Sequence, residues 1–81
     1  MADNMVLYFK PDCTYCVRTI YFIEKNGIEM ELRNIYEGDN QLQLMSVAGS
    51  GQVPCLIVDG EPIFDDEEIV AYLAERFGIQ Q

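Results

Sequence analysis

The sequence contains no histidine, only five lysine and arginine residues, and no run of about 18 apolar residues. Structural zinc sites usually need four cysteine or histidine ligands, and the chain offers only three cysteines, so no metal site is expected. Fourteen acidic residues against five basic ones give a net charge of −9, which repels nucleic acid phosphates and anionic lipid. We therefore expect neither a nucleic acid nor a membrane as a partner.

The cysteine count also limits the cellular compartment. Three cysteines are an odd number, which does not suit a secreted framework of paired disulfides. Residues 1–4 lack the basic start and small-residue cleavage site of a secretory signal, so we expect a cytoplasmic protein. With 81 residues, of which 49% are hydrophobic, residues 1–81 are expected to form a single domain with one modest core.

Two cysteines three positions apart, Cys13 and Cys16, follow an apolar stretch and precede a helical pattern. If Cys13 begins the helix, the two Cβ atoms are one turn and about 5–6 Å apart, close to the separation that a disulfide needs. The unpaired N–H groups and the positive end of the dipole at a helix start favour a thiolate at Cys13. Because a thiolate attacks disulfides, the pattern predicts thiol–disulfide chemistry with Cys13 as the nucleophile.

Charged residues around this pair act in opposite directions. Lys10 and Arg18 would stabilise a thiolate and attract an anionic ligand, whereas Asp12 would do the reverse. We interpret Arg18 as a solvated helix residue outside the site. Cys55 lies in an apolar stretch, where a free cysteine is usually a small buried hydrophobe.

The periodicity of the chain predicts the element order βαβαββα. Strands are expected over residues 5–9, 28–33, 53–58 and 62–64, and helices over 14–26, 40–48 and from 65 or 66 to 77. In the first helix, the apolar residues Val17, Ile20, Tyr21 and Ile23 recur at helical spacing. A βαβ unit implies a parallel pair of strands, and the turn at Asp59-Gly60 adds an antiparallel pair. Asp65 or Asp66 is expected to cap the last helix.

Four stretches in this order resemble a glutaredoxin, within the thioredoxin superfamily. They are Lys10, Cys13-Thr14-Tyr15-Cys16, Val53-Pro54 and Asp65-Asp66. The resemblance covers residues 5 to 77. It implies an α/β, thioredoxin-like fold in which three helices flank a four-stranded mixed sheet.

The resemblance also implies glutathione as a co-substrate and a cis peptide before Pro54, facing the reactive cysteine. It places Lys10 near the glycine carboxylate of glutathione and Tyr15 along the groove. Val53 would pair with the cysteinyl backbone, in the manner of an added β-strand.

The same resemblance assigns the other end of glutathione to the start of the last helix. The N–H groups of Asp65 and Asp66 would receive the γ-glutamyl carboxylate, because a helix N-terminus binds anions. The Asp66 side chain would then meet the γ-glutamyl ammonium. Gln52 stands where relatives often have threonine, and its amide can still hydrogen-bond a ligand carboxylate.

The sequence departs from the family pattern at Thr14, where many relatives have proline, and residues 61–73 look equally like the N-terminal domain of a glutathione transferase. The leading hypothesis is a monomeric, glutathione-dependent oxidoreductase that reduces protein disulfides and glutathionylated proteins. One alternative is an iron–sulfur carrier, in which Cys13 from two protomers and two glutathione molecules hold a [2Fe–2S] cluster. Another is a related redoxin reduced by thioredoxin reductase. A transferase is a weaker alternative, because those enzymes carry a second, helical domain.

Overall fold

The computed structural model describes residues 4–80. Its elements are β1 (Met5–Phe9), α1 (Thr14–Lys25), β2 (Glu31–Asn34), α2 (Asn40–Ala48), β3 (Cys55–Val58), β4 (Glu61–Phe64) and α3 (Asp66–Phe77). The strands form one sheet in the order β2-β1-β3-β4, with β1 parallel to β2 and antiparallel to β3, and β3 antiparallel to β4. The predicted element order and the four-stranded mixed sheet are confirmed.

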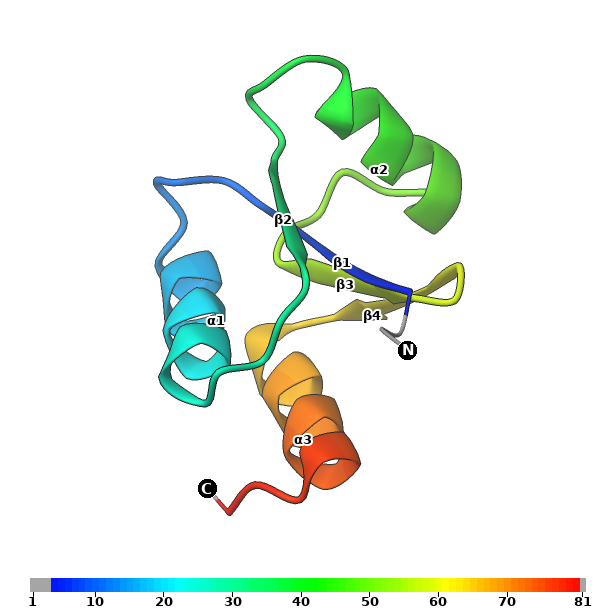
Figure 1. Cartoon of the computed structure of the whole chain (residues 1–81). Helices are drawn as coiled ribbons and strands as arrows, with labels where there is room; N and C mark the ends of the chain where they lie inside the picture. The colour runs from blue at the N-terminus through cyan, green and yellow to red at the C-terminus, as the bar shows by residue number, and fades with distance from the viewer. Residues whose placement is uncertain (1–3, 81) are drawn as a thin grey trace.

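The three helices divide between the two faces of the sheet: α1 and α3 lie side by side on one face, and α2 covers part of the other (Figure 1). The side chains of β1 alternate between the faces, as a strand requires. Leu7 is fully buried under α1 and α3, with Ile23 and Leu73 in the same core cluster. Tyr8 points to the opposite face, in a second cluster with Leu44 of α2.

Two strands begin later than predicted. The parallel ladder with β1 starts at Glu31, because the chain leaving α1 first turns at Gly27 and the Ile28 N–H bonds to the Ile23 carbonyl at 3.0 Å. Strand β3 starts at Cys55, and the cis Val53-Pro54 peptide lies directly before it. The cis peptide itself was predicted from the resemblance.

The apolar stripes of two helices are narrower than their spacing predicts. In α1, Ile23 faces the core, whereas Val17 and Tyr21 are 55% and 64% exposed. In α2, only Leu44 is buried, and Leu42 and Met45 lie in solvent. A surface helix needs to bury only one stripe, so further apolar residues at helical spacing remain outside.

The start of α3 differs from the prediction. Asp65 occupies the N-cap position, but its side chain makes no capping hydrogen bond, and Asp66 is already the first helical residue. The cause is the backbone of Asp65, whose φ of 70° lies far from the extended conformation of a normal N-cap. Asp66, Glu67 and Glu68 in the first turn instead interact favourably with the helix dipole.

The outer strands of the sheet are short and charged. Strand β2 carries Glu31 and Arg33, whose side chains form an ion pair at 2.7 Å, and β4 carries Glu61 and Pro62. Arg33 also donates hydrogen bonds to the Tyr8 hydroxyl at 3.0 Å and to the Gln43 side chain at 2.9 Å, so it joins β1, β2 and α2. Within residues 4–80, no helix is long and apolar enough to cross a membrane.

Candidate active site

Cys13 lies at the N-cap of α1, in an extended conformation with φ −106° and ψ 115°. Its Sγ accepts a hydrogen bond from the Cys16 N–H at 3.2 Å, and its own N–H donates to the Lys10 carbonyl at 3.3 Å. The sulfur is therefore held at the positive end of the helix dipole, with a backbone N–H directed at it. Cys13 is half-buried, so reagents in solution can reach it.

Cys16 and Cys55 have the opposite environment. Both are fully buried, and all three cysteines are free thiols. Burial, reinforced by the hydrogen bond with Cys13, raises the pKa of Cys16 from 9.0 to about 12. Burial alone raises the pKa of Cys55 from 9.0 to about 11. Cys55 is thus the small buried residue that its apolar surroundings predicted.

A groove of about 460 Å³ opens between the start of α1, the cis peptide and the start of α3. It is lined by Tyr15, Gln52, Val53, Pro54, Asp65, Asp66, Glu67 and Glu68. Six of the seven residues predicted to bind glutathione are in this lining; the seventh, Lys10, is not. Lys10 lies instead beside the cysteine pair, where its charge acts on Cys16.

The groove combines free donors with negative charge. The first N–H groups of a helix have no acceptor within that helix, so those at the start of α3 are available to a carboxylate. Glu67 and Glu68, which the sequence did not suggest as site residues, line the same groove and are exposed. This end of the groove is thus suited to a group that carries both a carboxylate and an ammonium.

Arg18 contacts two of the predicted site residues, although the sequence placed it outside the site. Its guanidinium lies 3.8 Å from the Asp66 carboxylate and 5.9 Å from the centre of the Tyr15 ring. The Asp66 side chain is only 14% exposed, whereas that of Arg18 is 63% exposed. The spacing of three between Tyr15 and Arg18 on one helix was the available signal. The sequence holds no signal for the contact with Asp66, which lies 48 positions further along the chain.

Tyr36 is the second residue that sequence reasoning missed. Its hydroxyl donates to the Asp12 carboxylate at 2.8 Å, next to Cys13. The Asn34 side chain accepts the Tyr36 N–H at 2.9 Å, and the neighbouring Ile35 N–H bonds to the end of β1 at 2.8 Å, so the loop is firmly placed. The hydrogen bond to Asp12 and the nearby charges of Asp12 and Cys13 raise the pKa of Tyr36.

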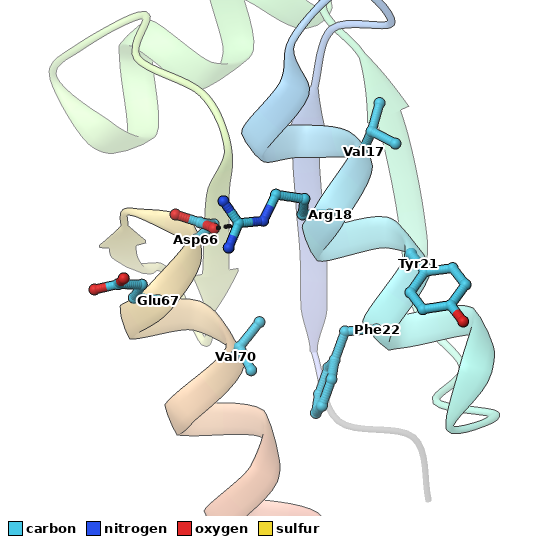
Figure 2. A pocket seen from close by; sticks show the side chains of 7 residues that line it. All are labelled: Val17, Arg18, Tyr21, Phe22, Asp66, Glu67 and Val70. Atoms are coloured by element: carbon cyan, nitrogen blue, oxygen red, sulfur yellow. Dashed lines mark ion pairs between the residues drawn. The ribbon is translucent and has the colours of Figure 1, made fainter. Parts of the chain in front are cut away.

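A second groove, of about 710 Å³, runs between α1 and α3 (Figure 2). It is lined by Val17, Arg18, Tyr21, Phe22, Asp66, Glu67 and Val70. Figure 2 shows Arg18 reaching across from α1 to Asp66, with Phe22 and Val70 beyond that ion pair. Asp66 and Glu67 line both grooves, so the two hollows adjoin. Within residues 4–80, no cluster of three or more His, Cys, Asp or Glu residues is placed to hold a metal ion.

Comparison with known proteins gives one family and a set of similar structures. The family model described as Glutaredoxin matches residues 5–63. Glutaredoxin from Archaeoglobus fulgidus is 24% identical, with a TM-score of 0.71 over 90% of this chain and 84% of that one. Glutaredoxin 2 from Salmonella typhimurium, solved in complex with glutathione, is also 24% identical, with a TM-score of 0.79 over 96% of this chain. A search of curated protein sequences found no match.

Some similar structures are much longer than this chain. Glutathione transferase Omega 3C from Trametes versicolor is 20% identical, with a TM-score of 0.78 over 96% of this chain. The chain spans 35% of that transferase and 36% of the Salmonella glutaredoxin 2. These likenesses show that the chain has the predicted thioredoxin-like fold.

Proposed function

Because the chain belongs to the glutaredoxin family, we propose that it is a glutathione-dependent thiol–disulfide oxidoreductase. Its substrates are protein disulfides and mixed disulfides between proteins and glutathione, and it acts as a monomer in the cytoplasm. The observation that carries the proposal is the position of Cys13. Cys13 is half-buried at the start of α1, and its sulfur accepts a backbone N–H. Tyr15, two residues further along, lines the groove at the cis Val53-Pro54 turn.

The reaction begins when the Cys13 thiolate attacks the glutathione sulfur of a glutathionylated protein. The bond between the two substrate sulfurs breaks, the protein leaves as a thiolate, and a disulfide forms between Cys13 and glutathione. The thiolate of a second glutathione then attacks the glutathione sulfur of that disulfide. Cys13 leaves as a thiolate, and glutathione disulfide is released. The two electrons that reduce the substrate disulfide therefore come from glutathione.

The environment of Cys16 supports this route over one in which Cys16 resolves the intermediate. Cys16 is fully buried and has a pKa of about 12, so little of its thiolate exists near neutral pH. Glutathione from solution is therefore the better second nucleophile. For a protein disulfide, Cys13 first forms a mixed disulfide with the protein, and Cys16 or glutathione completes the reduction.

The groove between the start of α1 and the start of α3 is the proposed glutathione site. Val53 pairs with the cysteinyl backbone beside Pro54, and the Tyr15 ring packs along the ligand. The N–H groups of Asp65 and Asp66 bind the γ-glutamyl carboxylate. The Asp66 carboxylate, held by Arg18, receives the ammonium.

The glycine end of glutathione points toward Gln52 and Lys10 in this proposal. Gln52 is exposed on the rim of the groove, where its amide can donate to the glycine carboxylate. Lys10 lies outside the lining of the groove, so its ammonium acts from beside the cysteine pair.

The test is glutathione-dependent reduction of a glutathionylated peptide by the wild type, Cys13→Ser and Cys16→Ser. We expect Cys13→Ser to lose turnover, because the nucleophile is removed, and Cys16→Ser to retain most of it. Cys55→Ser is the matched control, since it changes a buried cysteine away from the pair. A wild type that turns over with thioredoxin reductase but not with glutathione would contradict the proposal.

A further inference from the structure

The groove between α1 and α3 is lined by large apolar side chains, two of which are mostly exposed to solvent. Val17 and Tyr21 of α1 are 55% and 64% exposed, and Phe22 and Val70 in the same lining are half-buried. The hollow has a volume of about 710 Å³, enough for two or three side chains of another molecule (Figure 2). Apolar surface gathered in a groove and bordered by charges is typical of an interaction site.

The charges at the rim of this groove indicate what fits it. Arg18 is paired with Asp66, whereas Glu67 has no ion-pair partner among residues 4–80. A lysine or arginine of the bound partner would form an ion pair with Glu67, and its aliphatic stem would pack on the apolar side chains of the groove. The whole chain carries a net charge of −9, which also attracts a basic partner during its approach.

The position of the groove along α1 sets the distance between a residue bound in it and a disulfide at Cys13. Tyr21 lies eight positions beyond Cys13 on the axis of α1, which corresponds to about 12 Å at 1.5 Å per residue. An extended peptide covers that distance in about four residues at 3.3 Å each. Asp66 and Glu67 line both this groove and the active-site groove, so a segment bound between α1 and α3 lies next to the proposed glutathione site.

We propose that the groove between α1 and α3 docks the protein substrates of this oxidoreductase, and that they carry an apolar residue and a basic residue about four positions from the reactive cysteine. This inference rests on the proposed function, because it requires that a disulfide carried by the docked protein reach Cys13. It names the substrate class that the groove selects: basic segments with an apolar residue, in extended conformation.

The test uses three synthetic peptides of equal length, each with one glutathionylated cysteine. The first carries Leu-Lys four positions after the cysteine, the second carries Leu-Lys directly beside it, and the third carries Ser-Glu four positions after it. The kcat/KM of each is measured with the wild type and with the double variant Val17→Ser, Tyr21→Ser. The matched control is Leu42→Ser, Met45→Ser, which changes two exposed apolar residues on α2, on the opposite face of the sheet. Bis(2-hydroxyethyl) disulfide serves as a substrate too small to occupy the groove.

We expect the wild type to prefer the first peptide by about tenfold in kcat/KM, and high salt to reduce this preference because part of it is electrostatic. The groove variant should lose the preference, the α2 variant should keep it, and all three proteins should reduce the small disulfide equally. Equal kcat/KM for the three peptides, or a preference that survives in the groove variant, would overturn the docking proposal while activity on the small disulfide upholds the proposed function. Absence of all turnover would overturn both. Dimers in the wild type that the groove variant abolishes would assign the groove to a second copy and also overturn the proposal.

Discussion

Cys13 and Cys16 are three positions apart, yet one lies at the surface end of α1 and the other lies in the interior below it. Cys13 is reachable from solvent and accepts a backbone hydrogen bond, whereas Cys16 is fully buried and has a pKa of about 12. The interior strand position Cys55 resembles Cys16, with a pKa of about 11, although it has no neighbouring cysteine. The spacing brings two sulfurs together, but the helix start determines which one is chemically available.

The largest expected effect is the difference in alkylation rate between Cys13 and the two buried cysteines, which tests the contrast directly. At pH 8 we expect iodoacetamide to modify Cys13 at least about a hundredfold faster than Cys16 or Cys55, because both buried thiols have raised pKa values and little access. Mass spectrometry of the labelled peptides after brief exposure measures this ratio. Comparable labelling of Cys16 in the folded protein would remove the distinction between the two positions.

A second effect concerns stability at high pH. The pKa of Cys16 is raised from 9.0 to about 12 in the folded state, so folding favours the protonated thiol. Its contribution is complete below pH 9 and is lost as the pH rises from 9 toward 12. Between pH 8 and pH 10.5 we expect the free energy of unfolding to fall by about 2 kcal/mol less in Cys16→Ala than in the wild type.

Urea unfolding at the two pH values measures this difference. Tyrosine and lysine titrations are common to both proteins and cancel in the comparison. An identical pH dependence in Cys16→Ala would show that the Cys16 environment does not penalise its thiolate.

A third, smaller effect tests the structural role of the exposed sulfur. Because Cys13 Sγ accepts the Cys16 N–H at 3.2 Å, it caps α1 as well as carrying the chemistry. Cys13→Ala should destabilise the protein by about 1 kcal/mol relative to Cys13→Ser, whose hydroxyl can accept the same N–H. Equal unfolding free energies for the two variants would show that the sulfur is not a cap.

The smallest expected effect comes from Tyr36. Its hydroxyl donates to Asp12 at 2.8 Å, which holds that carboxylate in place and draws off part of its negative charge beside Cys13. In Tyr36→Phe, the freed carboxylate should slow Cys13 alkylation about two- to threefold by opposing the thiolate. Tyr21→Phe is the control, since it removes a hydroxyl at an exposed position far from Asp12. In an Asp12→Asn background, Tyr36→Phe should have no further effect.

The sequence predicted those features that depend on neighbouring residues. The bounds of β1 and α2, the turn at Asp59-Gly60 and the position of Cys13 at a helix start all follow from local apolar patterns, turn residues and helix signals. The cis Val53-Pro54 peptide came from the resemblance to glutaredoxins, since propensity alone does not predict it.

The sequence did not predict features that depend on tertiary contacts. Arg18 and Asp66 are distant in the chain, as are Tyr36 and Asp12, so no local pattern pairs them. Helical spacing showed which residues of α1 share a face, but the width of the buried stripe depends on how closely α3 packs beside it. Tyr21 therefore became part of an open groove and not part of the core.

The two outer strands have a consequence for behaviour at high concentration. A sheet edge is a template for further strands, and proteins that leave long apolar edges assemble into fibres. Here both edge strands, β2 and β4, are only four residues long. Strand β2 presents the Glu31–Arg33 pair, and β4 presents the carboxylate of Glu61 and Pro62, which has no N–H to donate. The chain should therefore resist strand-by-strand aggregation even when partial unfolding loosens its helices.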